Sequence, residues 1–456
     1  MDENPTALRI ADPGIRALFH LESRWQAWLD VEAALAEAEA ELGMIPAAAA
    51  VEIRAKARLG LLDRERIEEG LRRTAHQLVP LVWELTRVCE GDAGDYVHWG
   101  ATTQNVVQTG DLLVLRRAHG IFLGQIGAAL AAMADLAERS AEMALPGRTH
   151  GQHAVPITFG LKVAVWIDEF CRHVERLRAV EPRIFVCLLG GAAGSAASFG
   201  EQGLAVQAAL ARRLGMGAMA VPARTIGDHE AEYVCLLALV AQSAAKVAQE
   251  IYTGMKDEFG ELEEPVPAGT VGSSTMPQKR NPFLSQDVMA AAAEVRSRVG
   301  LALEAMATEH EADRRTSLMM RRALSESCAL TGDILARLEV LVAGLNLNPE
   351  RMRGNLELTG GLIMAEAIML ALGAHVGRQE AHDVVYDAAQ AAATGETDFA
   401  SLLGADARVR QHLSAPEIEA LIDPAAYTGR SAWIATEQAR RARELAAELS
   451  APGPSL

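Results

Sequence analysis

The sequence predicts an all-α protein built around a long central helical bundle. Half of the 456 residues are hydrophobic and only 4% are aromatic, so the core must consist mainly of Ala, Leu, Val, Ile and Met, a composition that favours helices. Apolar residues recur at helical spacing along most of the chain. Several of these periodic segments are longer than the three or four turns of an average helix.

Residues 1–109 are expected to form an N-terminal helical domain. Over residues 22–42 the apolar residues, among them Trp25 and Trp28, recur at helical spacing between acidic ones. Shorter helices are expected over residues 47–59 and 64–89. Glycines break the periodicity of residues 90–109, which predicts a loop of the kind that carries a site.

Residues 110–348 are expected to form the central bundle, which includes a long loop at residues 261–282. Long helical patterns run over residues 111–144, 159–180, 228–259, 283–310 and 321–345. Because their apolar faces are too wide for one neighbour to cover, we expect the bundle to continue across subunits. The intervals between these helices hold the polar motifs.

Residues 349–456 are expected to form a small C-terminal helical domain, because the helical patterns become shorter after Pro349. These patterns run over residues 352–358, 362–372, 378–393 and 417–422. The chain is therefore expected to divide into three helical parts.

Composition also narrows the function classes. A net charge of −17 and the lack of a basic run argue against a nucleic-acid surface, and an acidic body with a few cations suits a small anionic substrate. The five cysteines stand singly in apolar stretches, as free thiols do in a reducing cytosol. The N-terminal segment is acidic where a signal peptide is basic, and no uninterrupted apolar run approaches the roughly 20 residues of a membrane span. A soluble cytoplasmic protein without membrane or nucleic-acid partners is expected.

The most unusual segment is GSSTMPQKRNP at residues 272–282. Its small polar half predicts a mobile loop, and Lys279, Arg280 and Asn281 supply donors suited to a carboxylate. A serine in this setting could act as a base if cations and backbone N–H groups stabilise its alkoxide in a closed site. A solvated basic loop is the competing interpretation of this segment taken alone.

Two further polar clusters favour a site. GRTHGQHA at residues 147–154 holds two histidines, a threonine and a glutamine, and is expected to open a long helix, where free N–H groups attract anions. The cluster TTQN at residues 102–105 sets four consecutive polar side chains before another helix. An N-cap would need only one of them.

These motifs resemble the three regions that build the active site of the fumarase, aspartase, argininosuccinate lyase and adenylosuccinate lyase superfamily. GSSTMPQKRNP is similar to its signature loop, and GRTHGQHA and VHWGATTQNVVQT are similar to its two other regions. LTGGLIMAEAIMLAL and LIDPAAYTG resemble the branch that contains 3-carboxy-cis,cis-muconate cycloisomerase. The resemblance implies a tetrameric core of about 20 helices, with small N- and C-terminal helical domains and active sites shared by three subunits of a homotetramer.

The resemblance also implies roles for individual residues. Ser273 matches the general base that removes the proton next to a carboxylate of a small dicarboxylate-type substrate. Lys279 and Asn281 match residues that hold this carboxylate and stabilise the aci-carboxylate carbanion, and His150 matches the histidine that assists the leaving group. The candidate substrate-binding residues are Thr102, Thr103, Gln152, Thr149, His98, Asn105, Ser274, Met276, Arg24, His76 and Arg314. No metal or organic cofactor is implied.

Three departures from the family pattern bear on the leaving group. Gln286 stands where the lyases usually have a glutamate that pairs with the active-site histidine, so protonated His150 would gain less stabilisation. The cycloisomerase branch usually has tryptophan at the position of His150. Ala312 replaces an arginine of the H-E-R-D stretch of adenylosuccinate lyase, which leaves a nucleotide phosphate poorly served.

The favoured hypothesis is β-elimination from a substituted succinate to give fumarate, with cleavage of a C–N bond as in adenylosuccinate lyase. Three alternatives stay open. The first is lactone formation by a 3-carboxy-cis,cis-muconate cycloisomerase, and the second is release of nitrite from nitrosuccinate, which suits Gln286. The third is a lyase-derived structural protein without catalysis, as the lens delta-crystallins are.

Overall fold

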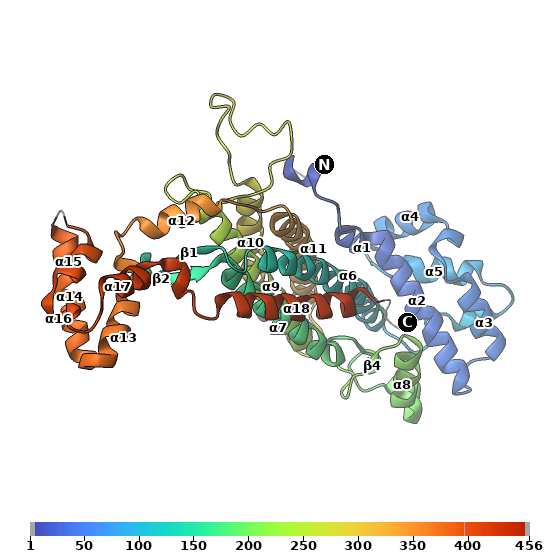
Figure 1. Cartoon of the computed structure of the whole chain (residues 1–456). Helices are drawn as coiled ribbons and strands as arrows, with labels where there is room; N and C mark the ends of the chain where they lie inside the picture. Colours follow the sequence, from blue (N-terminus) through green and yellow to red (C-terminus); the bar gives the residue numbers. More distant parts are fainter. Residues whose placement is uncertain (1–4, 396, 452–456) are drawn as a thin grey trace.

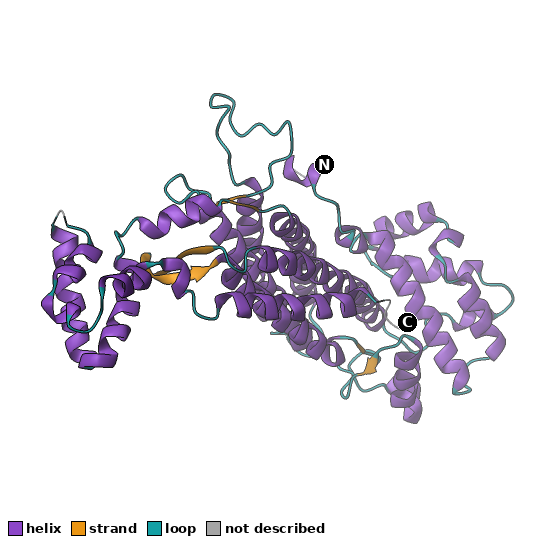
Figure 2. Cartoon of the chain, in the orientation of Figure 1, coloured by secondary structure: helices purple, strands orange, loops and turns teal. Residues whose placement is uncertain are grey.

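The computed structural model describes residues 5–395 and 397–451, and this part of the chain is predominantly helical. Figure 1 shows an elongated molecule, with a group of shorter helices at each end of a central bundle. Figure 2 shows how little strand there is, namely three short two-stranded pairs among the described residues. The predicted all-α class is confirmed. Residues 1–4, on which part of the signal-peptide expectation rests, lie outside the described residues.

The N-terminal helices pack around one long amphipathic helix, α2. Its tryptophans Trp25 and Trp28 are buried in a local core with apolar residues of the neighbouring helices, as the helical spacing predicts. The elements of this region are η1 (Pro5–Arg9), α1 (Ile15–Leu18), α2 (Leu21–Glu41), α3 (Ala47–Lys56), η2 (Leu59–Leu61), α4 (Arg64–Thr74), α5 (Val79–Val88) and η3 (Ala93–Tyr96).

Five long helices form the central bundle. At one or both of its ends, each helix agrees within a few residues with a helical segment predicted from the sequence. They are α6 (Thr103–Arg139), α7 (Phe159–Ile184), α9 (Asp228–Gly254), α10 (Phe283–Glu304) and α11 (Arg314–Ala343). One continuous core joins them, with Phe122 of α6, Phe170 of α7 and Tyr233 of α9 buried side by side with aliphatic residues. Between α7 and α9, η4 (Ala197–Gln202) leads into α8 (Gly203–Arg213), which packs against α2.

The C-terminal helices after residue 348 have a separate small core, in which Phe399 is fully buried. They are α12 (Pro349–Glu357), η5 (Leu362–Met364), α13 (Ala365–Val376), α14 (Arg378–Thr394), α15 (Phe399–Ala405), α16 (Ala407–Arg410), α17 (Ala415–Ile422) and η6 (Pro424–Tyr427). The last helix, α18 (Ser431–Ser450), instead returns along α6 and α7 and buries Ala439 and Ala442 in the central core (Figure 1). The last helix of the described residues thus packs on the central bundle rather than on the C-terminal helices.

One local expectation is wrong. Residues 147–154 do not open a helix, because they lie in an antiparallel hairpin of β1 (Ala144–Thr149) and β2 (Gln152–Thr158). Helix α7 begins only at Phe159, after Thr158, whose side chain accepts a hydrogen bond from the N–H of Leu161 at 3.3 Å. The β-branched and proline residues of the run VPIT favour an extended backbone up to that cap.

The remaining strands are two-residue pairs. β3 (Val186–Cys187) runs parallel to β4 (Gly217–Ala218), and β5 (Leu262–Glu263) pairs antiparallel with β6 (Asn346–Leu347). The second pair ties the segment after α9 to the segment after α11, and so fixes the entry to the loop that carries the most unusual motif.

Two described helices, α6 and α9, are long and apolar enough to cross a membrane, and α12 with the segment Leu362–Val376 passes the same test as one bent pair. Polar residues interrupt the apolar stretches of both helices, so neither contains an uninterrupted apolar run of the length of a membrane span. Both helices lie inside the bundle, where other helices of the chain bury about half of the most apolar window of each, 50% for α6 and 56% for α9.

Candidate active site

The serine loop, residues 265–282, joins β5 to α10 and is fixed at its two ends by one carboxylate. Glu264, buried just before the loop, accepts hydrogen bonds from the N–H groups of Leu284 at 3.0 Å and Ser285 at 3.1 Å, and from the Ser285 hydroxyl at 2.9 Å. These N–H groups belong to the first turn of α10, which its N-cap residue Pro282 cannot satisfy. Burial raises the pKa of Glu264 despite these hydrogen bonds.

Within the loop, the backbone folds around Ser273. Its Oγ atom accepts hydrogen bonds from the backbone N–H of Thr275 at 3.3 Å and of Met276 at 3.1 Å. Donors aimed at a hydroxyl oxygen stabilise the alkoxide that forms when the proton leaves. The Asn281 side chain donates to the carbonyl oxygen of Gly272, and a Cβ atom on Gly272 would lie 2.0 Å from the carbonyl oxygen of Lys279, so only glycine allows this close approach.

Lys279 and Asn281 line a large open cavity of about 1290 Å³ beside the loop, together with Met276 and Gln286. The neighbouring Arg280 forms an exposed ion pair with Glu263 at 3.6 Å. The two predicted carboxylate-binding residues therefore face one space, and Gln286 faces it with them. On the loop itself, Ser273 is half-buried and Ser274 is exposed.

The second motif stands at the tip of the hairpin. Thr149 pairs with Gln152 across a two-residue turn of His150 and Gly151, whose φ angles are 53° and 76°. Two positive φ values in a two-residue hairpin turn are those of type I′. This turn presents Thr149, His150 and Gln152 on an exposed tip. The strand register shifts between Gly147 and Arg148, and such a bulge turns the tip relative to the rest of the ribbon.

The third motif starts α6. Thr102 is its N-cap, and a capping box links Thr102 with Asn105. Asn105 points inward, because its side chain is buried and its Oδ1 accepts a hydrogen bond from the N–H of Gly191 at 3.1 Å. Its Nδ2 has no hydrogen-bond partner among the described residues. Thr103 faces the opposite way, into a second cavity.

This second cavity, of about 530 Å³, brings together four predicted substrate-binding residues from four segments of one chain: Arg24, His76, Thr103 and Arg314. The His76 ring faces the start of α5, because its Nδ1 accepts hydrogen bonds from the N–H groups of Leu78 and Val79, both at 3.3 Å. Neutral His76 consequently carries its proton on Nε2. We call this space the arginine cavity, since Arg224 and Arg321 line it as well.

Sequence reasoning missed the acidic residues of the arginine cavity. Asp111 receives two hydrogen bonds from Arg24, from Nε at 3.0 Å and from Nη2 at 2.5 Å, and lies 3.5 Å from Nε of Arg321. Glu230 also lines the cavity, and burial, with the nearby charge of Asp111, raises its pKa to about 7 although Arg321 opposes the shift. The sequence marks Glu230 only as one of two acidic residues in the first turn of α9, a position that is common for acidic residues in helices.

His98 comes shortly before Thr102 in the chain, but its side chain contacts helix α2. Its Nδ1 atom is 2.7 Å from Oε1 of the buried Glu32, and its φ of 62° is left-handed. Burial lowers the pKa of His98, but the charge and the hydrogen bond of Glu32 raise it more, so the pKa is raised overall. His98 therefore faces α2 in the described structure.

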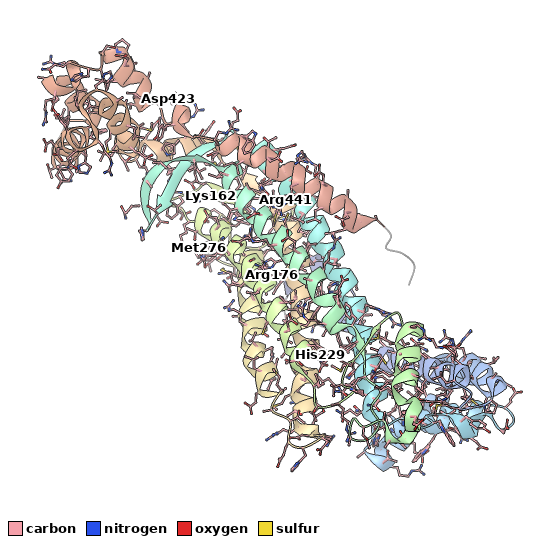
Figure 3. The ribbon with its side chains drawn as sticks, turned by 90° about the horizontal axis from the view of Figure 1, so that it is seen from below. Lys162, Arg176, His229, Met276, Asp423 and Arg441 are labelled. Carbon is pink, nitrogen blue, oxygen red and sulfur yellow. The ribbon has the colours of Figure 1, made fainter. Side chains whose placement is uncertain are left out.

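The three motifs of one chain lie apart. The residues that line the cavity beside the serine loop include none from the hairpin tip or from α6, and the arginine cavity includes none from the serine loop. Figure 1 shows the serine loop projecting from one side of the bundle and the hairpin on the side of the C-terminal helices. In Figure 3, Met276 of the loop and His229, the neighbour of Glu230, are well separated along the bundle. One chain thus offers three partial sites.

Neither the cysteines nor groups of potential metal ligands form a further site among the described residues. All five cysteines are free thiols, three of them buried. Among residues 5–395 and 397–451, no three His, Cys, Asp or Glu side chains are grouped so that they could hold a metal ion.

Comparison with known protein families gives two matches. Residues 7–297 match the family model described as lyase, and residues 361–437 match the model of the adenylosuccinate lyase C-terminus. The first match includes the α6 motif, the hairpin and the serine loop. It therefore covers all three regions described above.

Curated relatives cover nearly the whole chain. The chain is 40% identical to 3-carboxy-cis,cis-muconate cycloisomerase of Pseudomonas aeruginosa, with 92% of each chain covered. It is 38% identical to adenylosuccinate lyase of Methanothermobacter thermautotrophicus, covering 93% of this chain and 96% of the relative. It is 36% identical to N-acetyl-S-(2-succino)cysteine lyase of Dickeya dadantii, covering 91% and 92%.

Solved structures agree with these relatives. A fumarate lyase from a Mesorhizobium species superposes with a TM-score of 0.87 at 36% identity, covering 94% of this chain and 98% of that one. The 3-carboxy-cis,cis-muconate lactonizing enzyme from Pseudomonas putida superposes with a TM-score of 0.86 at 33% identity, covering 98% and 100%. The chain belongs to the fumarase/aspartase superfamily, and it is an enzyme of the branch that holds adenylosuccinate lyase and 3-carboxymuconate cycloisomerase.

Proposed function

We propose that the protein is a lyase that eliminates a group from the β-carbon of a substituted succinate and releases fumarate. The observation that carries this proposal is the pair of backbone N–H groups that donate to Oγ of Ser273, within the loop that also holds Lys279 and Asn281. This arrangement suits a serine base that must carry negative charge. The retained loop also argues against a structural protein without catalysis.

In the proposed reaction, Ser273 removes the proton from the carbon next to a substrate carboxylate. The electron pair moves into that carboxylate, whose oxygens are then doubly negative and are held by the Lys279 ammonium and the Asn281 amide. The pair returns to form the double bond as the leaving group departs from the neighbouring carbon. His150 assists that departure by donating a proton to the leaving atom.

The proposed enzyme is a homotetramer in which each active site takes the serine loop, the hairpin tip and the α6 motif from three subunits. Two features support this: the three motifs lie apart in one chain, and large apolar residues of the bundle helices are exposed. These exposed residues include Val165, Leu239, Leu303 and Val340. Free thiols and the acidic composition suit the cytoplasm, which we propose as its location.

The leaving group is proposed to be a nitrogen or sulfur atom that carries a larger anionic group. Two relatives are named for substrates in which a succinyl group is bonded to such an atom, adenylosuccinate and N-acetyl-S-(2-succino)cysteine. The arginine cavity supports an anionic leaving group, because four arginines and two acidic residues line it. We favour nitrogen, because His150 is present to protonate it.

Lactone formation is the second candidate, favoured by the 40% identity to a 3-carboxy-cis,cis-muconate cycloisomerase. Release of nitrite from nitrosuccinate stays a third alternative, since a leaving group that departs as a stable anion would not need the glutamate that Gln286 replaces. Incubation of the enzyme with N-succinyl and S-succinyl compounds, 3-carboxymuconate and nitrosuccinate separates the candidates. Fumarate absorbance, nitrite and lactone are the readouts, and lactone without fumarate from any succinate would overturn the proposal.

The assigned base is tested by Ser273→Ala. We expect kcat to fall by about 10²- to 10⁴-fold, because a general base contributes that much, while the molecular mass in solution stays that of the wild type. Ser274→Ala is the matched variant on the same loop and is expected to lose less. Turnover by Ser273→Ala at the wild-type rate would refute the assignment.

A further inference from the structure

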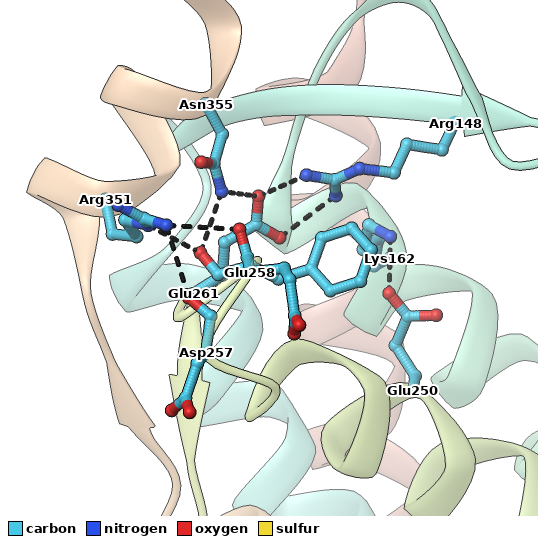
Figure 4. Close-up of polar contacts among 9 residues, drawn as sticks. Arg148, Lys162, Glu250, Asp257, Glu258, Glu261, Arg351 and Asn355 are labelled. Atoms are coloured by element: carbon cyan, nitrogen blue, oxygen red, sulfur yellow. Dashed lines mark hydrogen bonds and ion pairs between the residues drawn. The ribbon is translucent and has the colours of Figure 1, made fainter. Parts of the chain in front are cut away.

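A buried polar network joins the hairpin to the root of the serine loop. Arg148 of β1 donates two hydrogen bonds to Glu261, from Nη1 to Oε2 at 3.0 Å and from Nη2 to Oε1 at 2.6 Å. The Asn355 amide of α12 donates to Oε1 of the same carboxylate at 2.8 Å and to the carbonyl oxygen of Phe259 at 2.9 Å. Figure 4 shows Glu261 held between Arg148 and Asn355.

The turn that carries Glu261 is fixed from a second side. Arg351 of α12 donates to three successive carbonyl oxygens after α9, those of Asp257, Glu258 and Phe259, at 2.9 to 3.3 Å (Figure 4). The Arg148 guanidinium lies 4.9 Å from the centre of the Phe259 ring. The turn between α9 and β5 is therefore held from two sides, by α12 and by the hairpin.

Burial makes the Arg148–Glu261 contact specific. The side chains are only 16% and 5% exposed, and a planar guanidinium that meets a carboxylate with two hydrogen bonds allows one relative orientation. Arg148 stands at the register shift of the hairpin, two residues before His150, and Glu261 stands at the entry to the serine loop. The contact thus connects the two segments that carry the proposed acid and the proposed base.

We infer that Arg148, Glu261 and Asn355 act as a positioning clamp, which holds the His150 hairpin and the root of the serine loop in one fixed geometry. The inference rests on the proposed function, because only there do His150 and Ser273 act on a substrate. In the proposed tetramer the hairpin and the serine loop of one chain serve different active sites. The clamp therefore also links the geometry of two neighbouring sites.

Glu261→Gln tests the clamp, since it keeps the shape of the side chain and removes the charge that holds Arg148. We expect kcat to fall by about 10- to 100-fold, the usual cost of losing a residue that orients a catalytic group, with KM changed less than about threefold. Arg148→Lys keeps the positive charge but loses the two-point contact, and is expected to shift kcat in the same direction. It serves as the test if Glu261→Gln does not fold.

The matched control is Glu250→Gln. Glu250 binds Lys162 at 2.5 Å in the same region, but this ion pair joins α7 to α9 and touches neither the hairpin nor the loop (Figure 4). Glu250→Gln removes one negative charge, as Glu261→Gln does. Its kcat is expected to stay within about twofold of the wild type. An equal loss of kcat in this control would overturn the inference.

Hydrogen exchange tests the clamp without a substrate. In Glu261→Gln the amides of residues 147–155 are expected to exchange faster than in the wild type, and in Glu250→Gln they are expected to stay unchanged. Unchanged exchange overturns the clamp, and so does faster exchange with unaltered kcat, because the contact would then be purely structural. If the wild type turns over none of the candidate substrates, the proposed function fails, and the exchange result alone decides on the clamp.

Discussion

At the scale of single residues, the most informative side chains are polar groups held in unusual surroundings. Oγ of Ser273 accepts two backbone hydrogen bonds in an exposed loop, where a hydroxyl normally binds water. Glu230 is a half-buried carboxyl group close to the negative charge of Asp111. The first arrangement favours the charged form of its group and the second favours the neutral form.

Glu230→Gln is expected to stabilise the protein at neutral pH and above. The folded-state pKa of about 7 exceeds the ordinary value of 4.5, so the wild type loses stability as the pH rises between these values and stays at the lower level above pH 7. Glutamine stays neutral, so the advantage of the variant grows over this interval to about 2–3 kcal/mol. Thermal unfolding of both proteins from pH 4.5 to pH 8 measures it.

Glu232→Gln is the control for this effect on the same helix. Glu232 is half-buried and binds Arg183, which lowers the pKa of Glu232. Its replacement should therefore not stabilise the protein at high pH. A difference between Glu230→Gln and the wild type that does not vary with pH would contradict the assigned pKa.

At the scale of elements, the serine loop is fixed at its two ends by hydrogen bonds. Glu264 supplies the acceptors that the first turn of α10 lacks, and β5 pairs with β6 at the entry. Local hydrogen bonds also define the other two motifs. A type I′ turn forms the tip of the hairpin, and a capping box starts α6. Each motif is thus presented by an element whose end is defined by local hydrogen bonds.

Glu264→Ala is expected to free the exit of the serine loop. The N–H groups of half-buried Leu284 and buried Ser285 lose their acceptor, which costs about 1–3 kcal/mol for the buried group, so the thermal midpoint should fall. Trypsin should also cleave after Lys279 and Arg280 faster than in the wild type. Glu263→Ala, which removes the exposed neighbour of Glu264, should change the thermal midpoint much less. Equal cleavage and equal stability in the two variants would show that Glu264 does not anchor the loop.

At the scale of the whole molecule, the three motifs of the described chain are spread over two separate cavities and an exposed hairpin tip rather than gathered in one closed site. The elongated shape separates the serine loop from the arginine cavity along the bundle (Figure 3). The exposed apolar residues of the bundle helices are available for contact with other copies of the chain. Assembly is therefore expected to complete the site.

Mixing of inactive variants tests the assembly. Ser273→Ala and His150→Gln should each be inactive alone, but after joint unfolding and refolding at equal amounts about a quarter of the sites should be intact, since each site needs two suitable subunits at odds of one half each. Ser273→Ala mixed with Lys279→Met should recover no activity, because both changes lie on the same loop. Recovery in neither mixture would contradict sites shared between subunits. Fumarate absorbance is the readout.

Much of the fold follows from local pattern. The long helices were predicted from apolar spacing, although α6 starts at Thr103 rather than near residue 111 and α11 at Arg314 rather than near residue 321. In α6, polar residues of the segment predicted as a loop, 90–109, form the first turn after the cap Thr102, and in α11 the polar first turn follows the cap Asp313. The sequence analysis did not predict the hairpin, because the alternation of apolar and polar residues in its strands is short and includes two prolines. The division at residue 348 stays a prediction, and it does not anticipate the return of α18 to the central core.

The sequence by itself determined the helical class, the three motifs and the chemistry of their side chains, because backbone propensity and functional groups are local properties of the chain. Only the tertiary structure decided which of these groups meet. Arg148 and Glu261 are 113 positions apart, and Arg24 and Asp111 are 87 apart, and no spacing rule predicts such pairs. Their contact depends on how buried helix faces pack, and packing is a property of the whole chain.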